Sequence, residues 1–203
     1  MHIFFNMFGL WMFGRILENV WGSKRFLIYY LVTGLGAAFV QMFVNYLEFS
    51  SIQAHIQAFS NTPSVDLYIS LLKKYFGFAV NANINFVNEW SNHSVDPGMV
   101  NTAISHLNEY MGDLMSIPTV GASGAVFGVL LGFGMLFPNT SLYLFFIPVP
   151  IKAKWVVIGY GAIELYQGLT QPGSDIAHFA HLGGMLFGFI LIRIWNTRRT
   201  DFY

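Results

Sequence analysis

The sequence predicts an all-α membrane protein: a polytopic bundle of five membrane-spanning helices, with a polar insert between the second and third. Three observations support this prediction. Of the 203 residues, 55% are hydrophobic and only 10% are charged, whereas a soluble domain has about a quarter charged residues. The apolar residues gather in segments long enough to cross a hydrocarbon core of about 30 Å. Between the second and third segments, the composition becomes polar.

Composition also narrows the partners that the protein can have. Ten basic and ten acidic residues leave no net charge, and without a basic patch we expect no nucleic-acid partner. The chain has no cysteine, which excludes disulfides, thiolate-bound metals and a cysteine nucleophile. We expect no cofactor and no metal, and a lipid bilayer as the surrounding medium.

The predicted spans, in chain order, are residues 2–21, 26–47, 119–137, 153–170 and 176–195. The first two make up one membrane segment, residues 1–47, and the last three make up another, residues 119–203. Residues 48–118 form the insert between them, for which two amphipathic helices are predicted, Asp66–Phe76 and Pro97–Met115. Asp96 suits the N-cap of the second of these helices, and Pro97 suits its first residue.

The basic residues predict the orientation in the membrane. If the spans alternate in direction, eight of the ten basic residues lie on one side: Arg15, Lys24, Arg25, Lys152, Lys154, Arg193, Arg198 and Arg199. Membrane proteins keep such residues on the cytoplasmic side, so we expect a cytoplasmic C-terminus and an external insert. Met1 is then external, and because no span precedes it we expect an upstream span and its loop to be missing.

A single hydroxyl interrupts the start of the third span, in the stretch VGASGAVFGVL (residues 120–130), where Ser123 stands between Gly121 and Gly124. Two explanations compete. Small residues let membrane helices pack closely, so Ser123 can be a packing residue. Alternatively, Ser123 is a nucleophile that needs an uncrowded approach for a substrate carbonyl.

Four polar residues are expected at one depth in the membrane. Ser123 lies five residues past Pro118 and His181 lies six past Asp175, which places both about 8–9 Å below the outer boundary. His2 and Asn6, spaced i and i+4, share one face at the outer end of the first span. Polar side chains inside a membrane are by default candidates for a functional site.

Glycine spacing predicts that the third and fifth spans touch. The glycines are Gly124, Gly128 and Gly132 on the third span and Gly184 and Gly188 on the fifth, where they share the face of His181. Such faces approach closely enough for the Ser123 hydroxyl to reach the His181 imidazole. The imidazole would take the hydroxyl proton and later give it to a leaving amine.

This unit is a predicted dyad rather than a triad. The candidate carboxylate, Asp175, lies on a different helix face from His181 and nearer the water. Oxyanion stabilisation must then come from other donors, for which the Ser123 N–H and the side chains of His2 and Asn6 are candidates. Phe127, four residues after Ser123, shares its face and is placed to stack on the His181 ring.

Three segments resemble the signature segments of the rhomboid intramembrane serine proteases: HIFFNM, GASGAVFG and AHLGGMLFG. The stretch LFPNTSLYLFFIPVPIKAKW is also similar to the cytoplasmic loop of bacterial members of that family. The resemblance implies that Ser123 is the nucleophile and that His181, not His178, is the base. It also implies that His2 and Asn6 assist the oxyanion.

The resemblance further implies an endopeptidase that cleaves within or beside the transmembrane segments of other proteins, in a bacterial inner membrane. The sequence departs from the family pattern in three features. The first of six family spans, with the membrane-dipping loop after it, is absent. The insert of about 70 residues is larger than a minimal loop, and Phe127 stands where a tyrosine is often found.

Alternatives remain beside this interpretation. A non-proteolytic rhomboid-like protein that grips transmembrane segments is the second functional hypothesis, disfavoured because both serine and histidine are present. His2 and Asn6 could instead bond between helices. Glu164, within the fourth span, is expected to be an interfacial or helix-bonded carboxyl rather than a catalytic acid. A zinc site at His178 and His181 is disfavoured because no carboxylate is expected nearby and no Glu stands between the two histidines.

Overall fold

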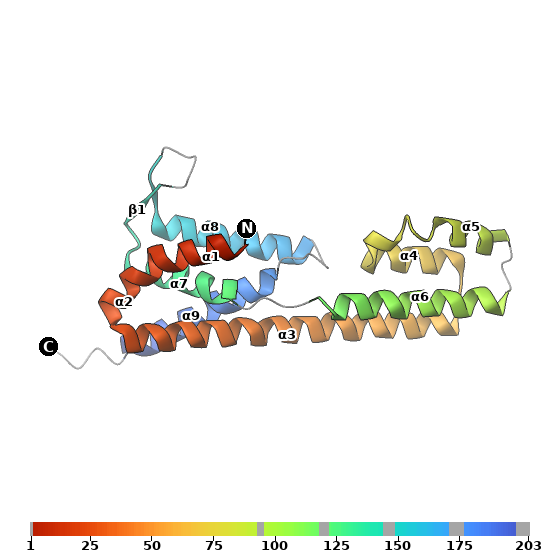
Figure 1. Ribbon diagram of the computed structural model, residues 1–203, viewed down its shortest axis with the longest axis horizontal. Helices are drawn as coiled ribbons and strands as arrows, with labels where there is room; N and C mark the ends of the chain where they lie inside the picture. Colours follow the sequence, from red (N-terminus) through yellow and green to blue (C-terminus); the bar gives the residue numbers. More distant parts are fainter. Residues whose placement is uncertain (1, 93–95, 118–121, 144–148, 171–176, 198–203) are drawn as a thin grey trace. The chain divides into compact units, whose positions relative to one another are not determined.

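The computed structural model describes residues 2–92, 96–117, 122–143, 149–170 and 177–197, with the backbone alone at residues 2, 196 and 197. Nearly all of these residues are helical (Figure 1). The longer helices are α1 (His2–Gly9), α2 (Arg15–Trp21), α3 (Ser23–Asn61), α4 (Val65–Tyr75), α5 (Ile84–Asn92), α6 (Pro97–Met115), α7 (Ala122–Leu136), α8 (Ala153–Thr170) and α9 (His178–Thr197). A π-helical turn, η1 (Leu10–Gly14), joins α1 to α2, and a 3-10 turn, η2 (Gly77–Ala79), follows α4. The predicted all-α class is confirmed.

The strand content of the described residues is one short ladder. Strands β1 (Ser141–Leu142) and β2 (Ile151–Lys152) pair antiparallel, with Ser141 opposite Lys152 and Leu142 opposite Ile151. Helix α8 begins directly after β2, at the residue predicted for the start of the fourth span.

Helix α3 is longer than the span predicted for it. It runs from Ser23 to Asn61 instead of ending near residue 47. The apolar stretch ends near residue 47, but no helix breaker follows until Pro63, which disfavours helix at the residue before it. Two described helices are long and apolar enough to cross a membrane, Ser23–Asn61 and His178–Trp195, and Ala122–Leu136 is a shorter apolar helix. The count of five spans stays a prediction.

The chain forms two compact units. One consists of Met1–Phe43 with Thr119–Tyr203, and the other of Val44–Pro118. The two membrane segments predicted separately, residues 1–47 and 119–203, therefore contribute to one unit, and α3 contributes residues to both units. The predicted limits of the insert, 48–118, stay a prediction.

In the first unit, α3 packs antiparallel against α7 through small residues. The pairs follow four-residue steps in opposite order: Gly124 with Ala37, Gly128 with Thr33, and Gly132 with Tyr29. A methyl group added at Gly124 would overlap Ala37, and one at Gly128 would lie 2.6 Å from the Thr33 Cβ. The Tyr29 hydroxyl donates a hydrogen bond to the Gly128 carbonyl at 2.7 Å, so its polar atom is satisfied inside the bundle.

Helices α7 and α9 run in the same direction and touch backbone to backbone. A methyl group at Gly184 would overlap the Gly124 carbonyl. Farther along, a methyl group at Gly188 would overlap the hydroxyl of Tyr29, which also faces Gly132. The close contact predicted from glycine spacing is therefore confirmed.

Helices α1 and α2 also run parallel to α7. Gly9 faces Val126, where a methyl group would lie 3.1 Å from Cγ1, and Leu17 lies against Gly132 nearer the other end of α7. Phe13, which stands between Gly9 and Leu17 in sequence, packs on Phe133 with ring centroids 4.9 Å apart. Helix α8 opposes α9, because Gly161 faces Met185 whereas Gly168 faces Phe179. The alternating directions expected for the five spans are the directions of these helices.

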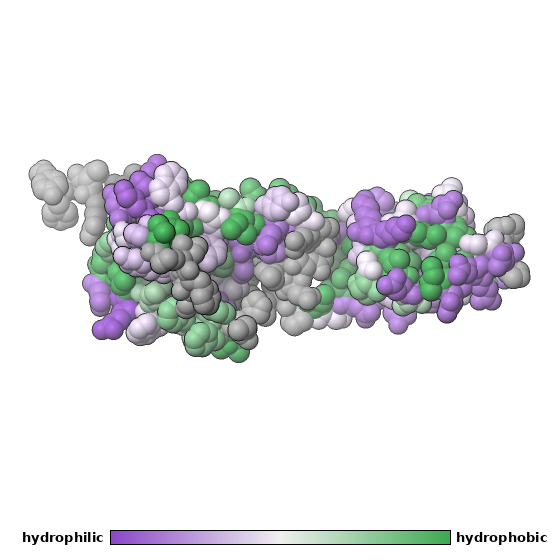
Figure 2. Space-filling view, turned by 90° about the horizontal axis from the view of Figure 1, so that it is seen from above, coloured by the Kyte–Doolittle hydropathy of each residue, from purple (hydrophilic) through white to green (hydrophobic). Residues whose placement is uncertain are grey.

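Large apolar side chains remain exposed over the first unit, including Trp11, Leu35, Phe39, Trp155, Ile163 and Leu169. On the face drawn in Figure 2, hydrophilic side chains cover much of the second unit, between smaller hydrophobic patches. The exposed apolar surface of the first unit is unfavourable in water and suits contact with lipid.

The second unit has its own core, built from α4, α5, α6 and the C-terminal part of α3. Its fully buried side chains include Phe59, Tyr68, Leu72, Phe76, Trp90 and Leu107. Both predicted insert helices are confirmed, with Ser64 capping α4 by accepting from the Leu67 N–H and Asp96 capping α6 by accepting from the Gly98 N–H. Helix α5 and the extension of α3 were not predicted.

A buried polar network ties this core together at Asn83. Its amide donates to the Ala79 carbonyl at 2.8 Å and the Tyr110 hydroxyl at 2.7 Å, while its oxygen accepts from the Tyr68 hydroxyl at 2.9 Å. The Tyr68 hydroxyl oxygen also lies 3.2 Å from Nδ1 of His106. Burial, and to a lesser degree Tyr110, raises the pKa of Tyr68 above its ordinary value, so this hydroxyl stays protonated and donating.

The contact at Gly184 generates a first prediction. The variant Gly184→Ala should destabilise the first unit by about 1–3 kcal/mol, because the added methyl group forces α7 and α9 apart. Gly159→Ala is the matched control: it makes the same change in α8, where a side chain meets nothing within 4 Å. Thermal unfolding in detergent measures both. Equal unfolding temperatures for the two variants would contradict the backbone contact.

A second prediction concerns Asn83. Asn83→Ala leaves buried hydroxyl and carbonyl groups without their partner, at a cost of about 1–3 kcal/mol. Amide hydrogen exchange of the full chain, followed by mass spectrometry, should then speed up within α4–α6 by roughly 5- to 150-fold. Asn101→Ala, at an exposed position of α6, is the control and should exchange like wild type. No difference between the two would show that the network contributes little.

Candidate active site

His181 lies in the first turn of α9. The N–H group of the residue before it, Ala180, makes two hydrogen bonds. The Ala180 N–H donates to the Ala177 carbonyl at 3.0 Å and to the side-chain oxygen of Gln41, on α3, also at 3.0 Å. The first N–H groups of a helix lack partners within the helix, and Gln41 supplies one from a neighbouring helix. His181 itself is buried.

Ser123 lies in the first turn of α7 and is half-buried. The next residue, Gly124, packs on the backbone of α9, where a methyl group added to it would lie 2.9 Å from the Ala180 carbonyl oxygen. Ser123 directly precedes Gly124 in sequence, and His181 directly follows Ala180. The structure therefore brings together the backbones that bear the predicted nucleophile and the predicted base.

Phe127 stacks on the His181 ring, as expected from its spacing to Ser123. The ring centroids are 4.0 Å apart and the planes differ by 7°. The edge of Tyr160, from α8, approaches the same phenyl ring with a centroid distance of 6.2 Å. The imidazole plane of His181 is thus held by a ring that contributes no hydroxyl.

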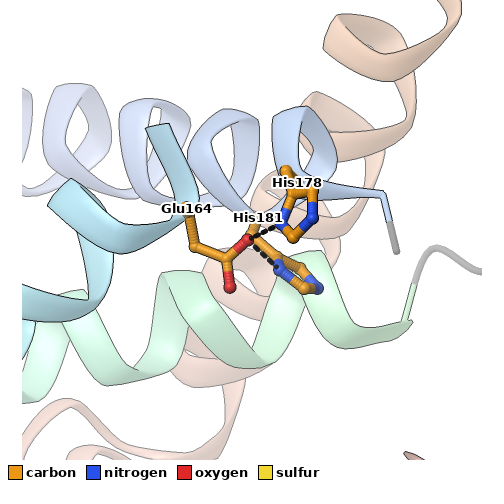
Figure 3. A group of neighbouring side chains, drawn as sticks. All are labelled: Glu164, His178 and His181. Atoms are coloured by element: carbon orange, nitrogen blue, oxygen red, sulfur yellow. Dashed lines mark hydrogen bonds and ion pairs between the residues drawn. The ribbon is translucent and has the colours of Figure 1, made fainter. Parts of the chain in front are cut away.

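Glu164 of α8 lies beside both histidines of α9 (Figure 3). Its Oε2 atom accepts a hydrogen bond from Nδ1 of His178 at 2.7 Å and lies 2.9 Å from Nδ1 of His181. All three residues are buried. The contact with His181 has the distance of an ion pair but lacks the alignment of a hydrogen bond, because the ring nitrogen does not point at the oxygen.

Of the two expectations for Glu164, the contacts fit the helix-bonded carboxyl and not the interfacial one, because the buried carboxyl contacts two histidines of α9. One expectation is corrected: a carboxylate does lie next to the predicted dyad. The sequence held a signal for this: Glu164 stands three residues after Gly161 and four before Gly168, and both glycines face α9. Residues at such spacing share a helix face.

One of the two reasons given against a metal at His178 and His181, the lack of a nearby carboxylate, is therefore wrong. The ligand atoms of Glu164, His178 and His181 all lie within 4.8 Å of one another. Tetrahedral zinc, however, separates ligand atoms at 2.0–2.1 Å from the metal by about 3.3 Å. The distances from the carboxylate oxygen to the two ring nitrogens, 2.7 and 2.9 Å, are shorter than this separation. They are typical of hydrogen bonds and ion pairs rather than of ligands around one metal ion.

The predicted oxyanion donors lie on α1. The side chain of His2 is outside the described part of the chain, as is Asp175. Asn6 is half-buried and stands one turn before Gly9, which packs on Val126, one turn after Ser123. Because α1 and α7 are parallel, this register puts Asn6 at the level of Ser123.

Comparison with known proteins finds similarity to rhomboid proteins. The family model of the rhomboid domain matches residues 1–57 and 75–197. Rhomboid protein 1, mitochondrial, of Saccharomyces cerevisiae is 41% identical over 71 residues, which are 35% of this chain and 20% of that protein. RHOMBOID-like protein 12, mitochondrial, of Arabidopsis thaliana is 33% identical over 116 residues, 56% of this chain and 32% of that protein. No solved structure matches.

The aligned stretches thus span less than a third of these curated relatives. Together with the candidate spans, the matches identify an integral membrane protein. The bacterial inner membrane expected from the sequence gains no support, because both relatives are mitochondrial by name.

Proposed function

Because this chain belongs to the rhomboid family, whose typical members are intramembrane serine proteases, we propose that it cleaves other membrane proteins within or next to their transmembrane segments. The observation that supports this most directly is the contact of Gly124 with the backbone of α9 at Ala180 and Gly184. Ser123 directly precedes Gly124 in sequence, and His181 directly follows Ala180. The partners are then transmembrane proteins presented through the lipid bilayer.

In the proposed reaction, the Ser123 hydroxyl attacks the scissile carbonyl while Nε2 of His181 takes its proton. The tetrahedral intermediate collapses to an acyl-enzyme, and the protonated imidazole gives its proton to the leaving amine. Water then attacks the ester with the same imidazole as base. The Ser123 N–H, Asn6 and His2 are the proposed donors to the oxyanion.

The substrate must present an accessible carbonyl. An intact helix holds its carbonyls in internal hydrogen bonds, which are costly to open inside a bilayer. The proposed protease therefore favours segments that unwind locally at small or helix-weakening residues. The arrangement of basic residues favours a C-terminus on the cytoplasmic side, or its equivalent in an organelle, with the insert opposite.

The first functional prediction tests the dyad. Ser123→Ala and His181→Ala should each lower cleavage of a transmembrane substrate in liposomes by about four orders of magnitude or more, and the double variant should be no worse. When two residues act as one unit, the rate losses of the single variants do not add in the double variant, whereas the losses from two independent roles would add. Labelling by a fluorophosphonate probe should disappear with Ser123.

Two matched substitutions at exposed positions, Ser70→Ala and His55→Ala, serve as controls and should leave cleavage and labelling unchanged. If the Ser123→Ala protein is labelled or cleaves like wild type, the nucleophile is assigned wrongly. If the wild-type protein binds a transmembrane segment without cleaving it, the non-proteolytic hypothesis is favoured.

A second functional prediction concerns Asn6. As a donor to the oxyanion and not a reactant, Asn6→Ala should lower kcat by about 10²- to 10³-fold without abolishing cleavage, with KM little changed. Asn19→Ala, at an exposed position of α2, is the control and should keep the wild-type kcat. A kcat of Asn6→Ala equal to that of the control would exclude the role in oxyanion binding.

A further inference from the structure

We propose that Glu164 is a positioning residue for the base: its carboxylate holds the Nδ1 side of His181, so that Nε2 faces Ser123. The proposal rests on the proposed function. It differs from a two-residue mechanism in making the active imidazole dependent on a third side chain, contributed by α8.

The first support is burial. A carboxylate inside a membrane bundle is costly unless charge or hydrogen bonds compensate it. Glu164 is 7% exposed, and its Oε2 atom accepts a hydrogen bond from His178 and lies at ion-pair distance from His181. The carboxylate is thus kept in the bundle by the two histidines, one of which is the proposed base.

The second support is the state of His181 Nδ1. This atom is buried and makes no hydrogen bond to any residue in the described part of the chain. The carboxylate oxygen of Glu164 lies 2.9 Å away, so a small rotation of the ring is enough to align a hydrogen bond with it. An unpaired buried N–H is unfavourable, which drives that rotation.

The chemistry requires this arrangement. Neutral imidazole accepts a proton at Nε2 only when Nδ1 carries the other one, and a carboxylate next to Nδ1 favours that tautomer. When Nε2 takes the Ser123 proton, the ring becomes a cation and the carboxylate lowers its energy. The Nδ1 proton stays on the ring throughout, and Nε2 later gives its proton to the leaving amine, so no net proton reaches Glu164.

The cluster also fixes the ring in two independent ways. Phe127, stacked at 4.0 Å, sets the plane of the imidazole, and Glu164 sets its rotation within that plane. His178 stands one turn before His181 and donates to the same oxygen at 2.7 Å. His178 thereby keeps the carboxylate pointed at α9 without taking part in proton transfer.

The test replaces the carboxylate by an amide of the same shape. For Glu164→Gln in the full protein in liposomes, we expect kcat to fall by about 10- to 100-fold while KM stays within about twofold of wild type. The rate of fluorophosphonate labelling, which reports the dyad without a transmembrane substrate, should fall by the same factor. Glu18→Gln makes the same chemical change on α2 and should alter neither quantity.

Each outcome decides the proposal. A Glu164→Gln protein with unchanged kcat and labelling rate overturns it, and so does one that unfolds at lower temperature while labelling at the wild-type rate, because that is a purely structural role. If Glu164→Gln does not fold, Glu164→Asp takes its place. The shorter side chain should lower the labelling rate several-fold, and a wild-type rate overturns the proposal.

The outcomes also separate this proposal from the proposed function. If wild type is neither labelled nor active, or if Ser123→Ala is as active as wild type, the proteolytic function fails and the role of Glu164 fails with it. If wild type is active, Ser123→Ala is inactive and Glu164→Gln equals Glu18→Gln, the protease stands and the positioning role alone is refuted.

Discussion

The contact between the backbones of α7 and α9 is the constraint on which the rest of the first unit depends. Neither Gly124 nor Gly184 leaves room for a methyl group, so the two helices approach as closely as their main chains permit. Ser123 precedes one of these glycines directly, and His181 stands one turn before the other. Any side chain at the crossing would move the backbones that carry Ser123 and His181 apart.

Sequence reasoning predicted this contact because glycine spacing is local information: residues four apart share a face, and a face without side chains has to meet a neighbour. It did not predict the contact of Glu164 with His178 and His181. That contact depends on how α8 is rotated against α9, which is a property of two helices together. The spacing of Gly161 to Glu164 indicates that both residues lie on the same face of α8. That one oxygen of Glu164 contacts both histidines, however, could be learned only from the structure.

The boundary of the insert shows a different limit. Hydropathy marks where a segment prefers to leave lipid, whereas a helix ends where its backbone is interrupted. Helix α3 has 39 residues, a length of about 58 Å, nearly twice a hydrocarbon core. Beyond the apolar stretch, Ile52, Ile56 and Phe59 repeat at helical spacing and enter the core of the second unit. This helical periodicity of apolar residues was present in the sequence. It was not recognised as a continuation of the helix because polar residues become frequent after residue 47.

The π-helical turn η1 has a consequence for the direction of Asn6. A π turn contains one residue more than an α turn, so it offsets the helix before it from the helix after it by about 100° around the axis. Leu17, after the turn, is anchored against Gly132, whereas Asn6 lies before it. Gly9, which faces Val126, also lies before the turn, so α1 and α2 each have their own contact with α7. The widened turn thus sets the angle at which α2 continues from α1, and with it the direction of Asn6 relative to Leu17.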